Sequence, residues 1–186
     1  MDKLFHLYKN VQPNEASMVI GLDGWVNAGE ASTLSVRYLI DRLRAEKIGK
    51  ITFGRFYVYQ IQRPLVSIKR GVVQDYRTIR NNIFYWTDKK EKCIVFLLGV
   101  EPHLDWMGYS QAVLDVAESL RVNRIYTLGG YLIDASLTKE PFITGSSNNS
   151  KLLAELRSIG IQLIDYNGPT SVYQLVFIVK SSGRAD

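Results

Sequence analysis

Apolar residues along the chain fall into short continuous runs and into helically spaced stripes, which alternate with one another. The run at 17–22 predicts a first strand, and the continuous run at 93–98 is typical of a strand that is buried on both faces. Between them, apolar residues recur three and four positions apart from Val36 to Leu43, which predicts a helix with one buried face. Strands and helices in alternation predict an α/β fold, a three-layer α/β/α arrangement with a mostly parallel sheet.

The predicted elements follow the order strand, helix, strand, antiparallel excursion, strand, helix, strand, helix, strand and a last element. Helices are expected at about 28–46, 106–121 and 149–158, and further strands at 50–53, 125–128 and 161–165. Asn27 and Glu30 form a capping-box pattern at the start of the first helix, and Gly49 is expected to end that unit.

The last apolar run, 171–180, fits a helix by its spacing and a strand by its β-branched residues. Pro169, just before it, favours the helix.

The segment from Arg55 to about residue 87 interrupts this alternation. It is rich in Tyr, Val, Ile and Thr, is broken by Arg63-Pro64 and Arg70-Gly71, and contains the alternating run 65–68. These features predict two or three short antiparallel strands that leave the main sheet. Tyr57, Tyr59 and Arg63 are candidates for a protein interface, and the alternative is a hairpin packed on its own domain.

Composition agrees with one globular domain over residues 1–186, because 46% of the residues are hydrophobic and 22% are charged. The N-terminus is too polar for a signal peptide, and no apolar run reaches membrane-spanning length, so no membrane association is expected. The one cysteine, Cys93, lies in an apolar run and predicts a buried thiol in a reducing compartment, the cytoplasm.

The net charge of +5 is unevenly distributed. Residues 37–92 contain fourteen Lys or Arg and five Asp or Glu. Such an excess could attract nucleic acid or an acidic partner, but solvated helix faces and lysine-protected strand edges also explain it. No aromatic-interleaved basic motif accompanies the charge, so we expect no nucleic-acid partner.

Catalytic motifs are not found in the sequence. It contains no GxSxG elbow, no Walker loop and no GxGxxG turn, and its two histidines are His6 and His103. One Cys and two distant His disfavour a metal site. Asp23, Glu101 and Asp134 could form a carboxylate cluster, but a turn contact, an arginine pair and loop exposure explain them too. We therefore expect no catalytic residue, metal or cofactor, and a protein that is not an enzyme.

Polar and glycine-rich loops follow several predicted strands, and ligands of parallel sheets bind beyond the carboxyl ends of strands. The candidate pocket residues are Asp23, Gly24, Trp25, Asn27, Glu101, Trp106, Gly129, Gly130, Thr144 and Gly145. The two indoles could stack on a ligand or pack the domain edge, and the Gly-Gly turn could admit a phosphate or merely close a turn. A nucleoside-, nucleotide- or phosphate-binding enzyme is therefore the alternative function.

Six fragments in a fixed order carry a family resemblance. They are 21–29, 59–64, 98–106, 128–130, 144–145 and 166–170. Together they resemble the proteasome assembly chaperone 2 family of archaea and bacteria, which is sometimes labelled as ATP-grasp enzymes, although no ATP-grasp hallmark is found here. The resemblance implies a fold similar to purine nucleoside phosphorylases, a homo-oligomer, and an assembly chaperone or scaffold whose partners are proteasome-type subunits.

The chain departs from the family pattern at two places. The loop at 135–141 lacks the His and Arg that the family carries there, so any role of those residues is not expected. The family also continues beyond the last helix, so we expect a short form or a truncated product. Apolar surface near 172–179 is then expected to be exposed or to be buried by a neighbouring subunit. Residues 184–186 do not match the C-terminal tail with which archaeal members dock on proteasome rings.

Overall fold

The computed structural model describes residues 4–52, 54–88, 92–132 and 142–182, with side chains as far as residue 177. It contains two compact units, which are described separately. One comprises Met1–Tyr131 with Ser171–Asp186, and the other comprises Leu132–Thr170. The single domain expected for residues 1–186 stays a prediction.

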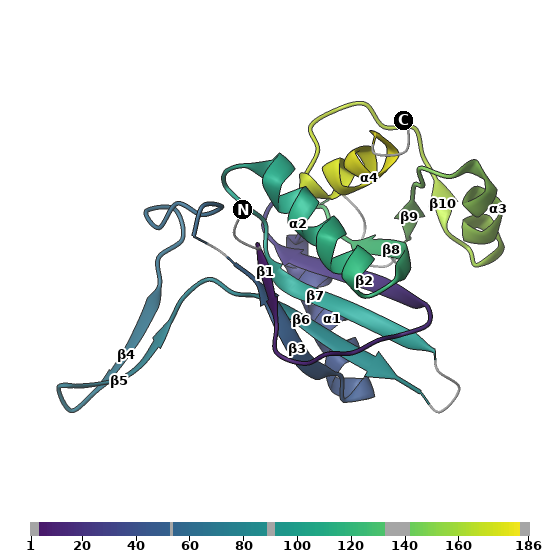
Figure 1. The fold of residues 1–186 in the computed structure, drawn as a ribbon. Coiled ribbons are helices and arrows are strands. Elements are labelled where there is room, and N and C mark those ends of the chain that lie inside the picture. The colour runs from purple at the N-terminus through teal and green to yellow at the C-terminus, as the bar shows by residue number, and fades with distance from the viewer. Residues whose placement is uncertain (1–3, 53, 89–91, 133–141, 183–186) are drawn as a thin grey trace. The chain divides into compact units, whose positions relative to one another are not determined.

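The first unit is built on a six-stranded sheet (Figure 1). In chain order its strands are β1 (Phe5–Leu7), β2 (Ala16–Asp23), β3 (Glu46–Ile51), β6 (Asn81–Thr87), β7 (Cys93–Val100) and β8 (Val122–Leu128). Their spatial order is β1-β3-β6-β7-β2-β8. Neighbours β7–β2 and β2–β8 pair in parallel, whereas β1–β3, β3–β6 and β6–β7 pair antiparallel. The sheet is therefore mixed, although β2, β3, β7 and β8 all run in one direction.

Helices cover both faces of this sheet (Figure 1). The short 3₁₀ helix η1 (Ala28–Glu30) leads into α1 (Ala31–Leu43), whose Val36 and Ile40 pack with Phe96 on one face. Helices α2 (Trp106–Ser119) and α4 (Val172–Ser182) cover the other face, where Val113 and Val176 join the larger core. The predicted α/β fold is confirmed, and the purine nucleoside phosphorylase-like arrangement stays a prediction.

The excursion is smaller than predicted. Strands β4 (Leu65–Lys69) and β5 (Val72–Arg77) form an antiparallel hairpin with a sheet of its own. Residues 81–87, which we expected to leave the main sheet, instead form β6 between β3 and β7. Its buried Ile83 joins the larger core, which explains why this part of the segment remains in the sheet.

The boundary after the first helix also differs from the prediction. Helix α1 ends at Leu43, because Arg44 adopts a left-handed conformation at φ 54° and caps the helix in the place of the expected glycine. Gly49 lies inside β3 and does not end the unit. A Cβ at Gly49 would lie 2.6 Å from the carbonyl oxygen of His6, so glycine allows β1 to approach β3 closely. Strand β1 itself was not predicted.

The second unit contains a two-stranded parallel sheet and one helix. Strand β9 (Thr144–Gly145) precedes helix α3 (Ser150–Ser158) in the sequence, and strand β10 (Gln162–Leu163) follows it. The two strands pair in parallel. Asn149 caps α3 by accepting a hydrogen bond from Lys151 N at 3.0 Å, and Gly160 follows at φ 83°, as expected for a residue beyond a helix end. The strand predicted at 161–165 is shorter than expected.

The C-terminal run forms α4, so the helical alternative is confirmed. The exposed apolar surface expected there is wrong for Val172, Tyr173 and Val176, which are buried in the core that α2 shares. The side chains of residues 178 and 179 lie outside the described ones. Within the part of the chain that the structure describes, no helix has the length and apolar character to cross a membrane.

Candidate functional site

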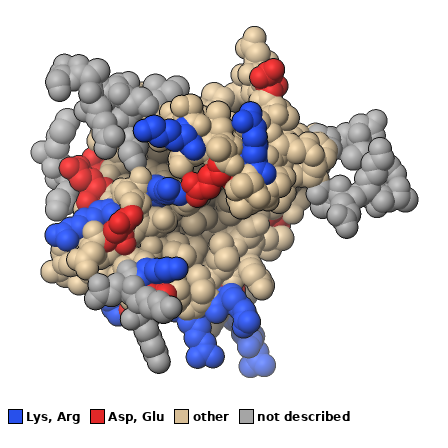
Figure 2. All heavy atoms as spheres, turned by 90° about the vertical axis from the view of Figure 1, so that its right-hand side faces the viewer, with Lys and Arg blue, Asp and Glu red and all other residues tan. Residues whose placement is uncertain are grey.

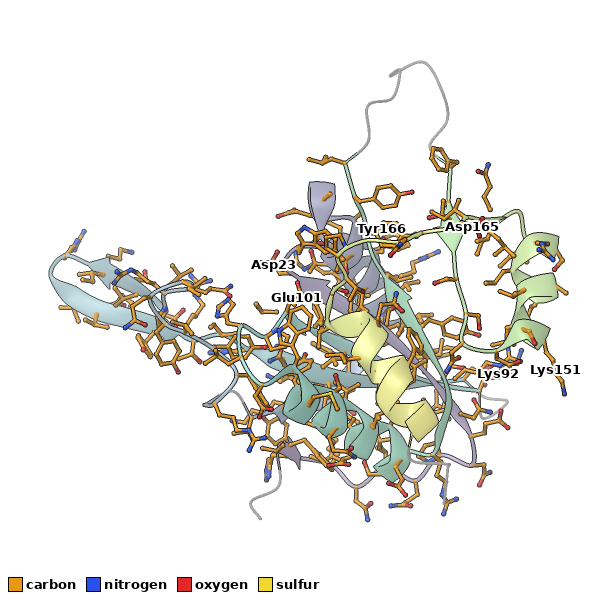
Figure 3. All side chains as sticks on the ribbon, turned by 90° about the horizontal axis from the view of Figure 1, so that it is seen from above. Asp23, Lys92, Glu101, Lys151, Asp165 and Tyr166 are labelled. Atoms are coloured by element: carbon orange, nitrogen blue, oxygen red, sulfur yellow. The ribbon has the colours of Figure 1, made fainter. Side chains whose placement is uncertain are left out.

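The candidate site lies where β2 and β7 end. These strands pair in parallel with Asp23 opposite Val100, so the residues that follow them emerge at the same edge of the sheet. Glu101 N donates a hydrogen bond to the carbonyl oxygen of Asp23 at 2.7 Å and extends the pairing by one step. Figure 3 shows the Asp23 and Glu101 side chains close together at this edge.

Glu101 is buried, with 8% of its surface exposed, and both of its carboxylate oxygens accept hydrogen bonds from backbone N–H groups. Oε2 accepts from Trp25 N and Oε1 accepts from Val172 N, each at 3.0 Å. The carboxylate thus connects the turn after β2 with the first residue of α4, where negative charge is favourable. From the sequence, an arginine was the expected partner of Glu101 if it did not join a carboxylate cluster, whereas in the structure its partners are these two backbone N–H groups.

Gly24 makes the approach of Glu101 possible. A Cβ at this position would lie 2.6 Å from both Cβ and Oε2 of Glu101, and Gly24 has a φ of 154°. Any larger residue would therefore displace the buried carboxylate. The close packing explains why a glycine follows Asp23 in this turn.

Asn27 organises the turn in a way that the predicted capping box does not describe. Its side chain makes no capping bond to η1; instead Oδ1 accepts from Thr33 N at 3.0 Å, in the first turn of α1. Its Nδ2 donates to Asp23 Oδ1 at 3.0 Å and thereby orients that carboxylate. The capping-box prediction is wrong, because Glu30 ends η1 in a left-handed conformation at φ 58° and occupies the N-cap position of α1.

The Gly129-Gly130 turn also lies at this edge. Gly130 N donates to Val26 O at 2.7 Å, and Ala28 N donates to Gly130 O at 3.2 Å. Because the amide of Gly130 is already bonded, it does not offer its N–H to a phosphate. This arrangement supports the structural interpretation of the glycine pair.

A cavity of about 470 Å³ opens beside Glu101, and this volume is in the range of small-molecule sites. It is lined by Asp23, Gly24, Trp25, Ile61, Gln62, Val100, Glu101, Pro102, His103 and Trp106. Half of this lining was among the predicted pocket residues. Asn27, Gly129 and Gly130 lie at the same edge of the sheet but outside the lining.

Three predicted positions are placed elsewhere or are not described. Thr144 and Gly145 belong to β9 in the second unit. Asp134, the third member of the expected carboxylate cluster, lies outside the described residues. So does the loop at 135–141, whose sequence differs from the family pattern. The expectation that Thr144 and Gly145 join the pocket at the sheet edge stays a prediction.

Tyr57 is a core residue, so the prediction that it lies in an interface patch needs correction. Only 6% of its surface is exposed, and its hydroxyl donates to Val100 O at 2.6 Å while it accepts from Asn81 Nδ2 at 2.6 Å. Its ring meets His103 edge-on at 5.6 Å, and His103 Nδ1 accepts from Val58 N at 3.1 Å. Tyr59 and Arg63, the other two candidates, are exposed.

Three buried tyrosines make hydrogen bonds to residues of the main sheet near this edge. Burial raises the pKa of the Tyr57 and Tyr109 hydroxyls well above the ordinary value, and it raises the pKa of Tyr173 to about 12. The Tyr173 hydroxyl accepts from Leu22 N at 2.8 Å and contacts Ser32 Oγ at 3.0 Å. These hydroxyls therefore stay protonated near neutral pH and act as fixed hydrogen-bonding groups.

Metal-binding and redox groups do not gather at the site. Among the described residues, no three His, Cys, Asp or Glu side chains converge as metal ligands would. Cys93 is buried, as predicted, at the opposite end of β7, where its Sγ lies 3.1 Å from the Tyr85 hydroxyl. The site is therefore an aromatic and carboxylate-lined cavity.

Charged side chains are mixed on the face of the molecule that Figure 2 shows. Basic and acidic groups lie next to one another there, with several basic groups along the lower margin of the view. Such a mixture is typical of an ordinary solvated surface.

Comparison with protein families gives a match over most of the chain. The model of the PAC2 family matches residues 21–179, which include the strands, turns and helices that build the cavity. Among curated proteins, none matches this chain.

Solved structures share the fold. A proteasome-assembly chaperone homologue from Mycobacterium tuberculosis is 26% identical, with a TM-score of 0.79 over 90% of this chain and 70% of that one. A PAC2 family protein from Streptomyces avermitilis is 22% identical, with a TM-score of 0.79 over 91% and 71% of the two chains. The archaeal proteasome activator PbaB of Pyrococcus furiosus is 19% identical, with a TM-score of 0.72 over 96% and 75%.

Proposed function

The chain belongs to the PAC2 family, and from that premise we propose that it is a non-enzymatic, homo-oligomeric assembly chaperone or scaffold of the cytoplasm. Its proposed partners are proteasome-type subunits. The similarity to the Mycobacterium tuberculosis proteasome-assembly chaperone homologue supports this role. The buried carboxylate and tyrosines support it as well, because each of them has a structural hydrogen-bonding partner.

The observation that carries the proposal is the apolar face of the β4–β5 hairpin. Val66 pairs with Tyr76, and Ile68 pairs with Val73 after a register shift between Ser67 and Ile68 that places both pairs on one face. These four side chains are between 55% and 61% exposed. The opposite face is more polar, since it carries the pairs Leu65–Arg77, Ser67–Asp75 and Lys69–Val72. The hairpin is therefore amphipathic, and its apolar face is uncovered.

An amphipathic hairpin requires something to cover its apolar face. A two-stranded sheet alone is only marginally stable in water, and antiparallel sheets ordinarily bury their apolar face against a core. All residues of β4 and β5 are exposed in the single chain. We assign the covering role to a second copy of this chain, because the face contributes apolar surface without a charge pattern specific to a different partner.

Subunits of a proteasome-type ring are the proposed clients of that oligomer. In the test, proteasome-type subunits are purified from the organism that produces this protein and are incubated either with or without the wild-type protein. Native mass spectrometry follows the formation of rings. We expect rings to form several-fold faster in its presence. An unchanged rate, together with turnover of a nucleoside that Asp23→Asn abolishes, would replace the chaperone role with an enzymatic one.

A further inference from the structure

The cavity beside Glu101 combines negative charge with indole rings. Asp23 and Glu101 contribute carboxylates to its lining, and Trp25 and Trp106 contribute aromatic surface. No Lys or Arg is among the described residues that line it. Trp25 is 62% exposed, an unusual state for an indole unless a ligand or partner covers it.

The two carboxylates are not equivalent. Both oxygens of Glu101 are engaged by backbone N–H groups, so this side chain is committed to the structure. Asp23 accepts from Asn27 at Oδ1, and no donor to Oδ2 occurs among the described residues. Asp23 is also exposed to solvent. It therefore keeps an oriented carboxylate oxygen available at the cavity.

This chemistry disfavours an anion. A phosphate site requires cationic side chains or free backbone amides, and the cavity lining contains no cationic side chain within the described chain. The nearby amide of Gly130 is bonded to Val26 O. The same lining favours a cation, because indole faces attract ammonium and guanidinium groups and a carboxylate forms ion pairs with them.

We propose that the cavity binds an organic cation, the guanidinium or ammonium head group of an arginine- or lysine-like molecule, between the Asp23 carboxylate and the indoles of Trp25 and Trp106. The source is either a basic side chain of a polypeptide or a free amine. Ile61 and Pro102 provide apolar surface for the alkyl stem of such a ligand. The site is independent of the assembly role and of the β4–β5 hairpin.

The test is an NMR titration of ¹⁵N-labelled protein with butylguanidinium, followed through the indole N–H signals. The chain has three tryptophans, and Trp86 on β6 is outside the cavity lining, so it is an internal reference. We expect saturable shifts at Trp25 and Trp106 with little change at Trp86. Butylurea, a neutral molecule of the same shape, should bind at least about tenfold more weakly.

Matched variants test which groups recognise the charge. Asp23→Asn should weaken butylguanidinium binding about fivefold or more, and Trp25→Leu should do so to a similar degree. Asp41→Asn makes the same chemical change on an exposed residue of α1 and should leave binding unchanged. Both substituted site residues are exposed, so neither change should prevent folding.

Two further ligands distinguish the sources of the cation. Tighter binding of N-acetyl-arginine methylamide than of the diamine putrescine supports a polypeptide side chain, and the reverse order supports a free amine. Absence of saturable shifts with butylguanidinium overturns the proposal. Equal binding of butylurea, or no effect of Asp23→Asn, overturns it too, as does a saturable response to inorganic phosphate at the same two indoles.

Discussion

At the scale of single residues, Glu101 is the side chain on which the site depends most. It accepts one hydrogen bond from the turn after β2 and one from the first turn of α4, segments far apart in the sequence. A buried carboxylate with two backbone donors is fully satisfied, whereas removal of one acceptor leaves a buried N–H without a partner. The position of α4 on the sheet therefore depends on this one group.

Glu101→Gln should lower the free energy of unfolding by about 1–3 kcal/mol. The glutamine amide has one oxygen, which can accept from Trp25 N or from Val172 N, and its NH₂ group then faces the other N–H without forming a hydrogen bond. Urea denaturation followed by circular dichroism measures the change. Glu118→Gln makes the same substitution on the exposed side of α2 and should change stability by less than about 0.5 kcal/mol. Equal effects of the two substitutions would show that the two hydrogen bonds of Glu101 contribute little.

Part of the candidate site was predictable from sequence, and the reason is the parallel pairing of β2 with β7. Once the two buried runs are parallel neighbours, Asp23 and Glu101 must emerge at one edge. Ile61 and Gln62 were not predicted, because their positions depend on the irregular path of the chain after β3. The burial of Tyr57 was missed as well, since a tyrosine is equally compatible with an interface and with a core that supplies a hydroxyl partner.

At the scale of elements, the end of α1 shows how an unusual cap alters a boundary. Arg44 occupies the left-handed position that glycine favours, and its N–H bonds to the carbonyl oxygens of Asp41 and Ile40. A non-glycine residue in this conformation is under strain of about 1 kcal/mol. The helix therefore stops three residues before the predicted end.

Arg44→Gly should stabilise the protein by about 0.5–1 kcal/mol, because glycine adopts the left-handed conformation without a Cβ clash. Arg42→Gly, two residues earlier and inside α1, should instead destabilise it by about 1 kcal/mol. Thermal unfolding of the two variants beside the wild type gives the comparison. A loss of stability in both would indicate that the Arg44 side chain contributes more than its backbone strain costs.

The same elements explain which parts of the fold the sequence could reveal. Continuous apolar runs identified β2 and β7, and helical spacing identified α1 and α2, because burial imposes these periods directly. The spacing at α4 left a helix and a strand open, and Pro169 favoured the helix. Strand β1 has three residues, too few for any period to be seen. Gly49 was predicted to end the first strand–helix unit. In the structure it instead allows β1 to approach β3 closely, and this contact depends on a pairing between residues far apart in the sequence.

At the scale of the whole molecule, the family membership and the hairpin lead to the same conclusion. The chain belongs to the PAC2 family, and it exposes an amphipathic β4–β5 hairpin whose apolar face lacks a cover. Burial of this face between copies would remove several large apolar side chains from water. The central claim is that this face joins copies of the chain into the proposed scaffold.

Sedimentation velocity of two neighbouring variants tests that claim most directly. Val73 and Val72 are 61% and 59% exposed in the same strand, but they lie on opposite faces of the hairpin. We predict that the wild type sediments as an oligomer, that Val73→Lys shifts it toward the 21.2 kDa monomer, and that Val72→Lys leaves the oligomer intact. A wild type that sediments as a monomer at micromolar concentration, or two variants that behave alike, would contradict the account.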